Sequence, residues 1–246
     1  MKHVKNVETL EKLLRFCTGY GGRYNPVRPK LQLSTLNALL AQANEAMSGE
    51  KLARTKYDNV TNTREVAFKE VPKLASRIVN LLSSSGASAQ ALDDARLFFH
   101  KLYGYEPKDR DPIPSPRKGS PPLPEPPSPE RKRAPGHKSY ASIADSFEKL
   151  VTMVSTVPGY QAHETTLKVD ALESKVVELK KLNTDAVEAR VNWSNGLTTR
   201  NQVLYTNDTA IYNTGREVKL YVKAAFGPDS EEYAKIKKLN FTKPTA

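Results

Sequence analysis

The chain has 246 residues, a length that suits two domains of ordinary size. Hydrophobic residues make up 38% and aromatic residues 8%, which is enough for small cores but lean for one large core. No uninterrupted apolar stretch approaches the roughly 20 residues of a membrane-spanning helix, and we expect no signal peptide. The many Leu, Ala, Lys and Glu residues favour an α-rich protein.

The formal net charge of +11 is concentrated in the first part of the chain. Residues 1–105 hold 16 basic and 9 acidic side chains, residues 106–137 hold 7 and 5, and residues 138–246 hold 15 and 13. Seven basic side chains near the start are candidate contacts for an anionic partner: Lys2, Lys5, Lys12, Arg15, Arg23, Arg28 and Lys30. Such a surface suits a polyanion or an acidic protein, and it equally suits a solvated surface that aids solubility.

The cysteine count bears on the compartment of the protein. Cys17 is the single cysteine, so the chain forms no internal disulfide. An intracellular, reducing setting fits that count, and we expect a cytoplasmic protein.

The first half reads as four helices. A short helix is predicted at about residues 6–20, before a turn at Asn25-Pro26. A long helix is predicted from about residue 31, and a third helix should end near Gly86, which suits a helix C-cap. A short fourth helix should follow Ser88. The long helix has apolar residues that step by three and four positions, namely Leu33, Leu36, Leu40, Ala43 and Met47.

The middle of the chain, residues 106–137, holds 11 of the 17 prolines. The run from Pro121 to Pro129 cannot form a regular helix or sheet and should be an extended spacer. A match to proline-rich ligand patterns at Lys118–Pro124 is open to either interpretation, a ligand for a partner groove or only a spacer.

The second half repeats the first at a nearly constant spacing. Glu11-Lys12-Leu13 matches Glu148-Lys149-Leu150. A spacing shorter by one position then relates a series of pairs: Tyr24 with Tyr160, Leu31 with Leu167, Leu36 with Leu172, Tyr57 with Trp193. Further on the spacing widens, so that Gly86 meets Gly227. The sequence therefore predicts a duplication, with helices of the second copy at about 141–157, from about 166, up to about 225, and after Ser230.

Two arginines of each long-helix stripe are shared by the copies. Arg54 matches Arg190, and Arg64 matches Arg200. A basic residue on a buried face needs a partner. These arginines could form a repeated anion site, or they could tie helices together, and we favour the structural role.

The sequence shows no pattern of catalytic or cofactor chemistry. Its four histidines and Cys17 are not spaced as metal ligands, and no phosphate-binding loop or nucleophile elbow is present. We therefore predict no catalytic residues, no cofactor and no metal.

Four segments stand out: Thr18-Gly19-Tyr20-Gly21-Gly22, Thr63-Arg64-Glu65-Val66-Ala67-Phe68, Thr199-Arg200-Asn201 and Val218-Lys219-Leu220-Tyr221. Together they resemble segments of a family of uncharacterised Bacteroidota proteins with two related halves. The resemblance implies a bacterial origin and the two-part organisation, and it implies no activity. The linker of this chain is richer in proline than the resemblance leads us to expect.

These observations predict an all-α protein with two homologous helical bundle units, residues 1–105 and 138–246, of about four helices each, joined by the proline-rich linker 106–137. The favoured function is a non-catalytic scaffold or binding protein that engages a macromolecular partner, without a membrane. The alternatives are a nucleic-acid- or ribosome-associated basic protein and an enzyme of unfamiliar type.

Overall fold

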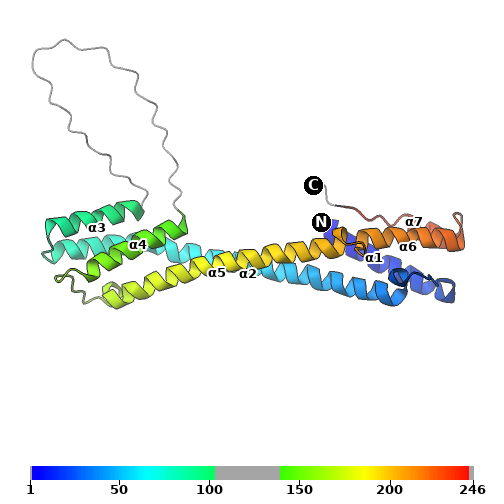
Figure 1. Cartoon of the computed structure of the whole chain (residues 1–246), viewed down its shortest axis with the longest axis horizontal. Coiled ribbons are helices and arrows are strands. Elements are labelled where there is room, and N and C mark those ends of the chain that lie inside the picture. The colour runs from blue at the N-terminus through cyan, green and yellow to red at the C-terminus, as the bar shows by residue number, and fades with distance from the viewer. Residues whose placement is uncertain (1, 103–138, 244–246) are drawn as a thin grey trace, which may run out of the picture. The chain divides into compact units, whose positions relative to one another are not determined.

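The computed structural model describes residues 2–102 and 139–243, and within these ranges it contains helices and no strand (Figure 1). The α-helices are α1 (Lys2–Gly19), α2 (Leu33–Ser84), α3 (Ala89–Leu102), α4 (Tyr140–Ser155), α5 (Val169–Asn201), α6 (Ile211–Phe226) and α7 (Glu231–Lys237). The short 3-10 helices are η1 (Gly21–Arg23), η2 (Pro29–Leu31) and η3 (Thr165–Leu167), and η4 (Gln202–Thr206) is a π-helix. The predicted all-α class is confirmed. None of the described helices is both long and apolar enough to cross a membrane.

The chain divides into two compact units. Unit 1 contains Met1–Asn59 with Val187–Ala246, and unit 2 contains Val60–Ala186. These units do not follow the predicted boundaries at residues 1–105 and 138–246, because the long helices α2 and α5 each contribute to both units. Each unit is thus built from both sequence halves. The predicted linker, 106–137, lies outside the described residues.

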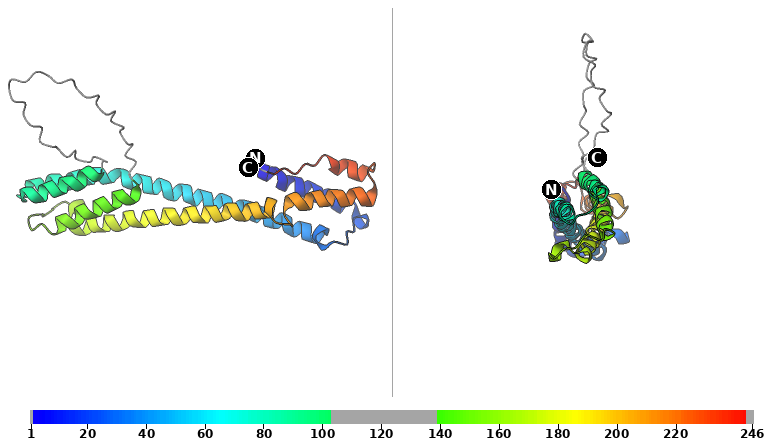
Figure 2. Two further views of the ribbon diagram at one scale, coloured as in Figure 1. Left: turned by 45° about the horizontal axis from the view of Figure 1, so that its top comes forward. Right: turned by 90° about the vertical axis from the view of Figure 1, so that its left-hand side faces the viewer.

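Unit 1 combines α1, the first part of α2, the end of α5, η4, α6 and α7 (Figure 2). The apolar residues of α1 recur every three or four positions, so one face of the helix enters the core. The fully buried large side chains of this core are Leu10, Leu13 and Leu36 from the first half of the chain and Leu204, Ile211 and Ile236 from the second.

Unit 2 combines the end of α2, α3, α4, η3 and the start of α5. Its fully buried large side chains are Ile78 and Leu82 from the first half and Phe147, Leu150, Leu172 and Leu179 from the second. Two to four helices that each present one apolar stripe can hide those stripes only against one another. Both cores therefore depend on residues from both halves.

The predicted helix ends agree with the structure. Gly86 has a φ of +74° just after α2, and Gly227 has a φ of +98° just after α6. Glycine adopts this region without strain, so both positions end a helix readily. The side chain of Ser88 accepts a hydrogen bond from the Ala91 amide at 3.2 Å, and Ser230 does the same for Tyr233 at 3.1 Å, so the serines cap α3 and α7.

The prediction of separate second and third helices is wrong for the first half and confirmed for the second. In the first half these two helices are one, the 52-residue α2, with Pro72 inside it. In the second half the chain breaks between α5 and α6, in the region where the spacing between matched residues of the two halves widens. The Asn207 amide donates to the Gln202 carbonyl five residues back at 3.2 Å, as the π-helix η4 requires.

A non-helical segment, Leu239–Lys243, packs along α6 and α1 in unit 1. The buried Asn6 side chain donates to the Thr242 carbonyl at 2.8 Å and accepts from the Thr242 amide at 3.0 Å. A Cβ atom at Gly215 on α6 would lie 2.4 Å from the Phe241 ring, so this ring needs a glycine beneath it. Asn6 and Gly215 thus form a fitted seat for the segment.

The turn that leads into each long helix is held by the same contact in both halves. Tyr24 donates its hydroxyl to the Leu31 carbonyl at 2.7 Å, and Tyr160 donates to the Leu167 carbonyl at 2.9 Å. Both tyrosines are buried. The two contacts join residues that the predicted duplication pairs with each other, Tyr24 with Tyr160 and Leu31 with Leu167.

Candidate functional site

The predicted basic contacts on α1 lie on its exposed face. Lys2, Lys5, Lys12 and Arg15 are all exposed, and Arg15 pairs with Glu11 one turn earlier at 2.7 Å. An exposed pair of this kind contributes little to stability. These side chains are therefore accessible to a partner.

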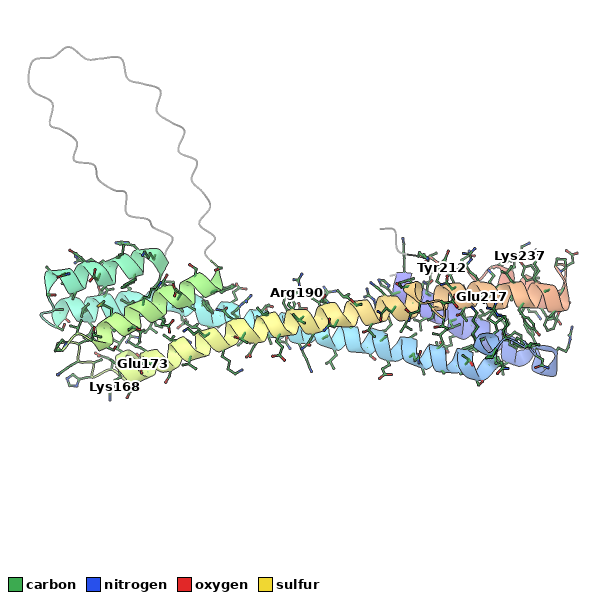
Figure 3. All side chains as sticks on the ribbon, in the orientation of Figure 1. Lys168, Glu173, Arg190, Tyr212, Glu217 and Lys237 are labelled. Carbon is green, nitrogen blue, oxygen red and sulfur yellow. The ribbon has the colours of Figure 1, made fainter. Side chains whose placement is uncertain are left out.

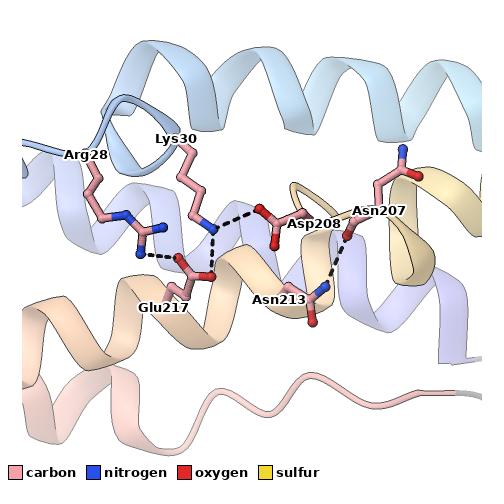
Figure 4. Close-up of polar contacts among 6 residues, drawn as sticks. All are labelled: Arg28, Lys30, Asn207, Asp208, Asn213 and Glu217. Carbon is pink, nitrogen blue, oxygen red and sulfur yellow. Dashed lines mark hydrogen bonds and ion pairs between the residues drawn. The ribbon is translucent and has the colours of Figure 1, made fainter.

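The other three predicted basic contacts pair with carboxylates of the second half (Figure 4). Arg28 and Lys30 bind Glu217 on α6 at 3.0 and 2.7 Å, and Lys30 also approaches Asp208 at 3.4 Å. The hydrogen bond from Lys30 to Glu217 raises the pKa of Lys30. Figure 3 shows Glu217 on α6.

Arg23 also forms an ion pair with a carboxylate of the second half. It pairs with Glu232 on α7 at 2.7 Å and stacks over the Phe226 ring at 4.7 Å. The Tyr20 hydroxyl donates to the Glu232 carbonyl at 2.8 Å beside it. The acidic groups that face Arg23, Arg28 and Lys30 thus belong to the same chain.

Two of the four shared arginines flank an aromatic pair in unit 1. The rings of Tyr57 and Trp193 stack with centroids 5.4 Å apart. Arg54 lies over Trp193 at 5.8 Å, and Arg190 lies over both rings at 5.7 and 5.6 Å. Both arginines are exposed (Arg190 is labelled in Figure 3), which corrects the expectation that they face a core. Guanidinium groups over aromatic faces are attracted by the ring electrons.

The other two shared arginines are partly buried. In unit 2, Arg64 lies over the Tyr140 ring at 4.3 Å, and its Nε atom has no hydrogen-bond partner among the described residues. In unit 1, Arg200 pairs with Glu50 at 3.3 Å, and these side chains are 11% and 13% exposed. Each of these two arginines thus contacts a residue from the other half of the chain.

A groove of about 500 Å³ lies beside this ion pair in unit 1. Its lining comes from α2 with Gln42, Glu45, Ala46, Gly49, Glu50 and Ala53, and from the second half with Asn192, Gly196, Thr199 and Val203. The helices approach closely, since a Cβ atom at Gly196 would lie 3.3 Å from the Glu50 Cα. Trp193 donates its indole N–H to Glu50 at 3.0 Å. Both carboxylate oxygens of Glu50 are engaged, so this group ties α2 to α5.

His3 adds a titratable group near Arg200. Its Nδ1 atom lies 2.9 Å from the Tyr205 hydroxyl. Burial and the charge of Arg200 lower the pKa of His3, while Glu50 opposes that shift. His3 is therefore neutral near pH 7 and packs on Tyr205 as an aromatic ring.

No group of acidic, histidine and cysteine side chains among residues 2–102 and 139–243 is arranged to hold a metal ion. Comparison with protein-family models, with curated proteins and with solved structures finds no match to this chain. The resemblance to a Bacteroidota family stays a prediction.

Sequence reasoning missed Glu50, Asn6 and Gly215. Glu50 lies three and four positions from Met47 and Arg54, within the predicted stripe, and this spacing could have indicated its partly buried position. Asn6 is defined by its contact with Thr242, near the other end of the chain, and Gly215 by the Phe241 ring. No local pattern indicates either contact.

Proposed function

We propose that this protein is a non-catalytic helical binding protein that engages an acidic macromolecule through unit 1. The observation that carries the proposal is the distribution of charge. The described residues of unit 1 hold 19 basic and 11 acidic side chains, whereas those of unit 2 hold 11 of each. A net charge of +8 on one unit favours association with an anionic surface and speeds the encounter.

The contact surface of this proposal is the exposed face of α1. Lys5 and Lys12 lie two turns apart on it and are exposed, whereas Arg23, Arg28 and Lys30 form ion pairs with carboxylates of the same chain. A cytoplasmic location is part of the proposal, and it depends on the single cysteine.

The test compares two charge-reversed variants of the full chain. Lys5→Glu with Lys12→Glu alters the proposed surface, and Lys73→Glu with Lys168→Glu makes the same change of charge at exposed sites in unit 2. Fluorescence anisotropy would measure binding to a labelled acidic polypeptide, a DNA duplex and a single-stranded RNA. We expect the first variant to weaken binding roughly tenfold and the second to have little effect. Equal losses, or no binding by the unaltered chain at low salt, would overturn the proposal.

The same assay separates the second candidate, a nucleic-acid- or ribosome-associated protein. The observation in its favour is the exposed Arg54 and Arg190 over the Tyr57–Trp193 pair, since arginines and aromatic faces together bind bases and phosphates. The binding constant for DNA or RNA would fall steeply with rising salt concentration. Loss of the phosphate contacts of Arg54 and Arg190 would lower the slope of log K against log salt concentration by about two. Binding of the acidic polypeptide without DNA or RNA binding would remove this candidate.

A further inference from the structure

Each core of this protein is completed by residues from both sequence halves. In unit 1, Leu10 and Leu36 of the first half share a core with Ile211 and Ile236 of the second. We infer that the two halves, residues 1–102 and 139–246, are interlocked subunits of a fused dimer, in which each half is the binding partner of the other. This inference is independent of the proposed function.

In unit 2, Ile78 and Leu82 of the first half share a core with Phe147 and Leu150 of the second. All four side chains are fully buried. A half without its partner would expose these stripes, and exposed apolar surface of this extent marks an interaction site. The partner that fits the surface is therefore the other half.

The contacts across the halves are reciprocal. His3 of the first half meets Tyr205 of the second with ring centroids 5.7 Å apart. Tyr140 of the second half meets Phe68 of the first at 4.8 Å. The spacing that relates Glu11 to Glu148 also relates His3 to Tyr140, and Phe68 and Tyr205 lie four and five positions after the matched Arg64 and Arg200. Such exchange of roles is the mark of an interface between two copies of one subunit.

Tyr57 and Trp193 extend this argument within unit 1. They are matched residues of the two halves, and they stack on each other. In a self-complementary interface, residues at the two-fold axis contact their own counterparts. A pair of independent bundles, each folded from one half, would give no such contact.

Charge also favours the pairing of the halves. Arg23 and Arg28 of the first half bind Glu232 and Glu217 of the second, and Glu50 of the first half binds Arg200 of the second. The basic excess of the first half is thus partly matched inside the chain. These ion pairs select the second half as the partner.

The first experiment cuts the full chain between the halves. A specific protease site is placed within residues 106–137, and the folded protein is cleaved under native conditions. We expect both fragments to elute together at the volume of the uncut chain, with an unchanged circular dichroism spectrum. The melting temperature of the cut protein should then depend on its concentration. Elution as two separate helical fragments would overturn the inference.

The second experiment fixes the interface by a disulfide. The Cβ of Glu50 lies 3.7 Å from a Cβ built on Gly196, a separation that suits a disulfide. In the cut chain, Glu50→Cys with Gly196→Cys should give one band of the full mass on a non-reducing gel, and each single variant should give two. Cys17 is buried and should not compete. Failure to cross-link in a folded double variant, or a band of twice the chain's mass before cleavage, would overturn the pairing within one chain. If the double variant does not fold, the elution of the unaltered cut chain decides.

Discussion

The effect of Gly215→Ala on the stability of the protein should change sign when the Phe241 ring is removed. Alanine is about 1 kcal/mol more favourable than glycine inside a helix, so Gly215→Ala would stabilise α6 if its surroundings were empty. They are not empty, because the new Cβ would lie 2.4 Å from two carbons of the Phe241 ring. A ring cannot bend away, so Phe241 and the segment Leu239–Lys243 must move.

The loss can be estimated from the contacts of the segment. Exposing the half-buried Phe241 costs about 1.5 kcal/mol. Leaving the buried Asn6 amide without Thr242 costs about 2 kcal/mol. With the helical gain of about 1 kcal/mol subtracted, Gly215→Ala should lower the free energy of unfolding by about 2–3 kcal/mol.

Urea unfolding followed by circular dichroism would measure this change in two backgrounds. In the Phe241→Ala background the ring is gone, so Gly215→Ala should stabilise the protein by about 1 kcal/mol. Gly49→Ala on α2 is the matched control, because a Cβ there meets nothing within 4 Å, and it should stabilise equally in both backgrounds. The reasoning is refuted if Gly215→Ala destabilises both backgrounds to the same extent.

Three further predictions concern buried groups. Tyr160→Phe removes the hydrogen bond to the Leu167 carbonyl and should cost about 1 kcal/mol in urea unfolding. Tyr24→Phe removes the hydrogen bond to the Leu31 carbonyl and also the contact of its hydroxyl with the Cys17 thiol, so it should cost at least as much, and a clearly smaller cost would contradict the equivalence of the two turns. Because burial and Arg200 lower the pKa of His3 below its ordinary value of 6.5, the unfolded chain binds more protons. Stability should therefore be retained above pH 6.5 and fall as the pH drops below it, and His3→Gln should flatten this slope in urea titrations across that range. Burial raises the pKa of the Cys17 thiol to about 12, so a thiol reagent should label it only when the protein unfolds, and rapid labelling of the folded protein would be inconsistent with its position.

The local features of the fold follow from the sequence. Helix ends at Gly86 and Gly227 and caps at Ser88 and Ser230 depend on single residues and their near neighbours, and all four lie as predicted. The continuity of α2 through Pro72 does not follow from the sequence. Proline usually interrupts a helix, yet α2 continues through Pro72. The buried residues before it, Phe68 and Val71, and after it, Ala75, pack into the same core and hold the helix there.

The pairing of helices could not be read from the sequence, and the predicted duplication gives a physical reason. Similar halves present similar apolar stripes, so a stripe fits its own half and the other half almost equally well. Arg23, Arg28 and Lys30 illustrate the same limit. Their carboxylate partners lie 209, 189 and 187 residues away, so no local sequence pattern indicates these ion pairs.

The contacts that occur in only one unit indicate where the halves have diverged. The tyrosine turns occur twice, so both units need them to fold. The cluster of Arg28, Lys30 and Glu217 occurs once, because the matching positions hold Glu164, Thr166 and Ser76.

The π-helix η4 and the seat for Leu239–Lys243 are likewise found in unit 1, and unit 1 also carries the excess of basic residues. π-helices are frequent at functional sites. The contacts specific to unit 1 and its excess of basic residues thus both favour unit 1 as the binding unit. Within it, the exposed face of α1 is the part that carboxylates of the same chain leave most open to a partner.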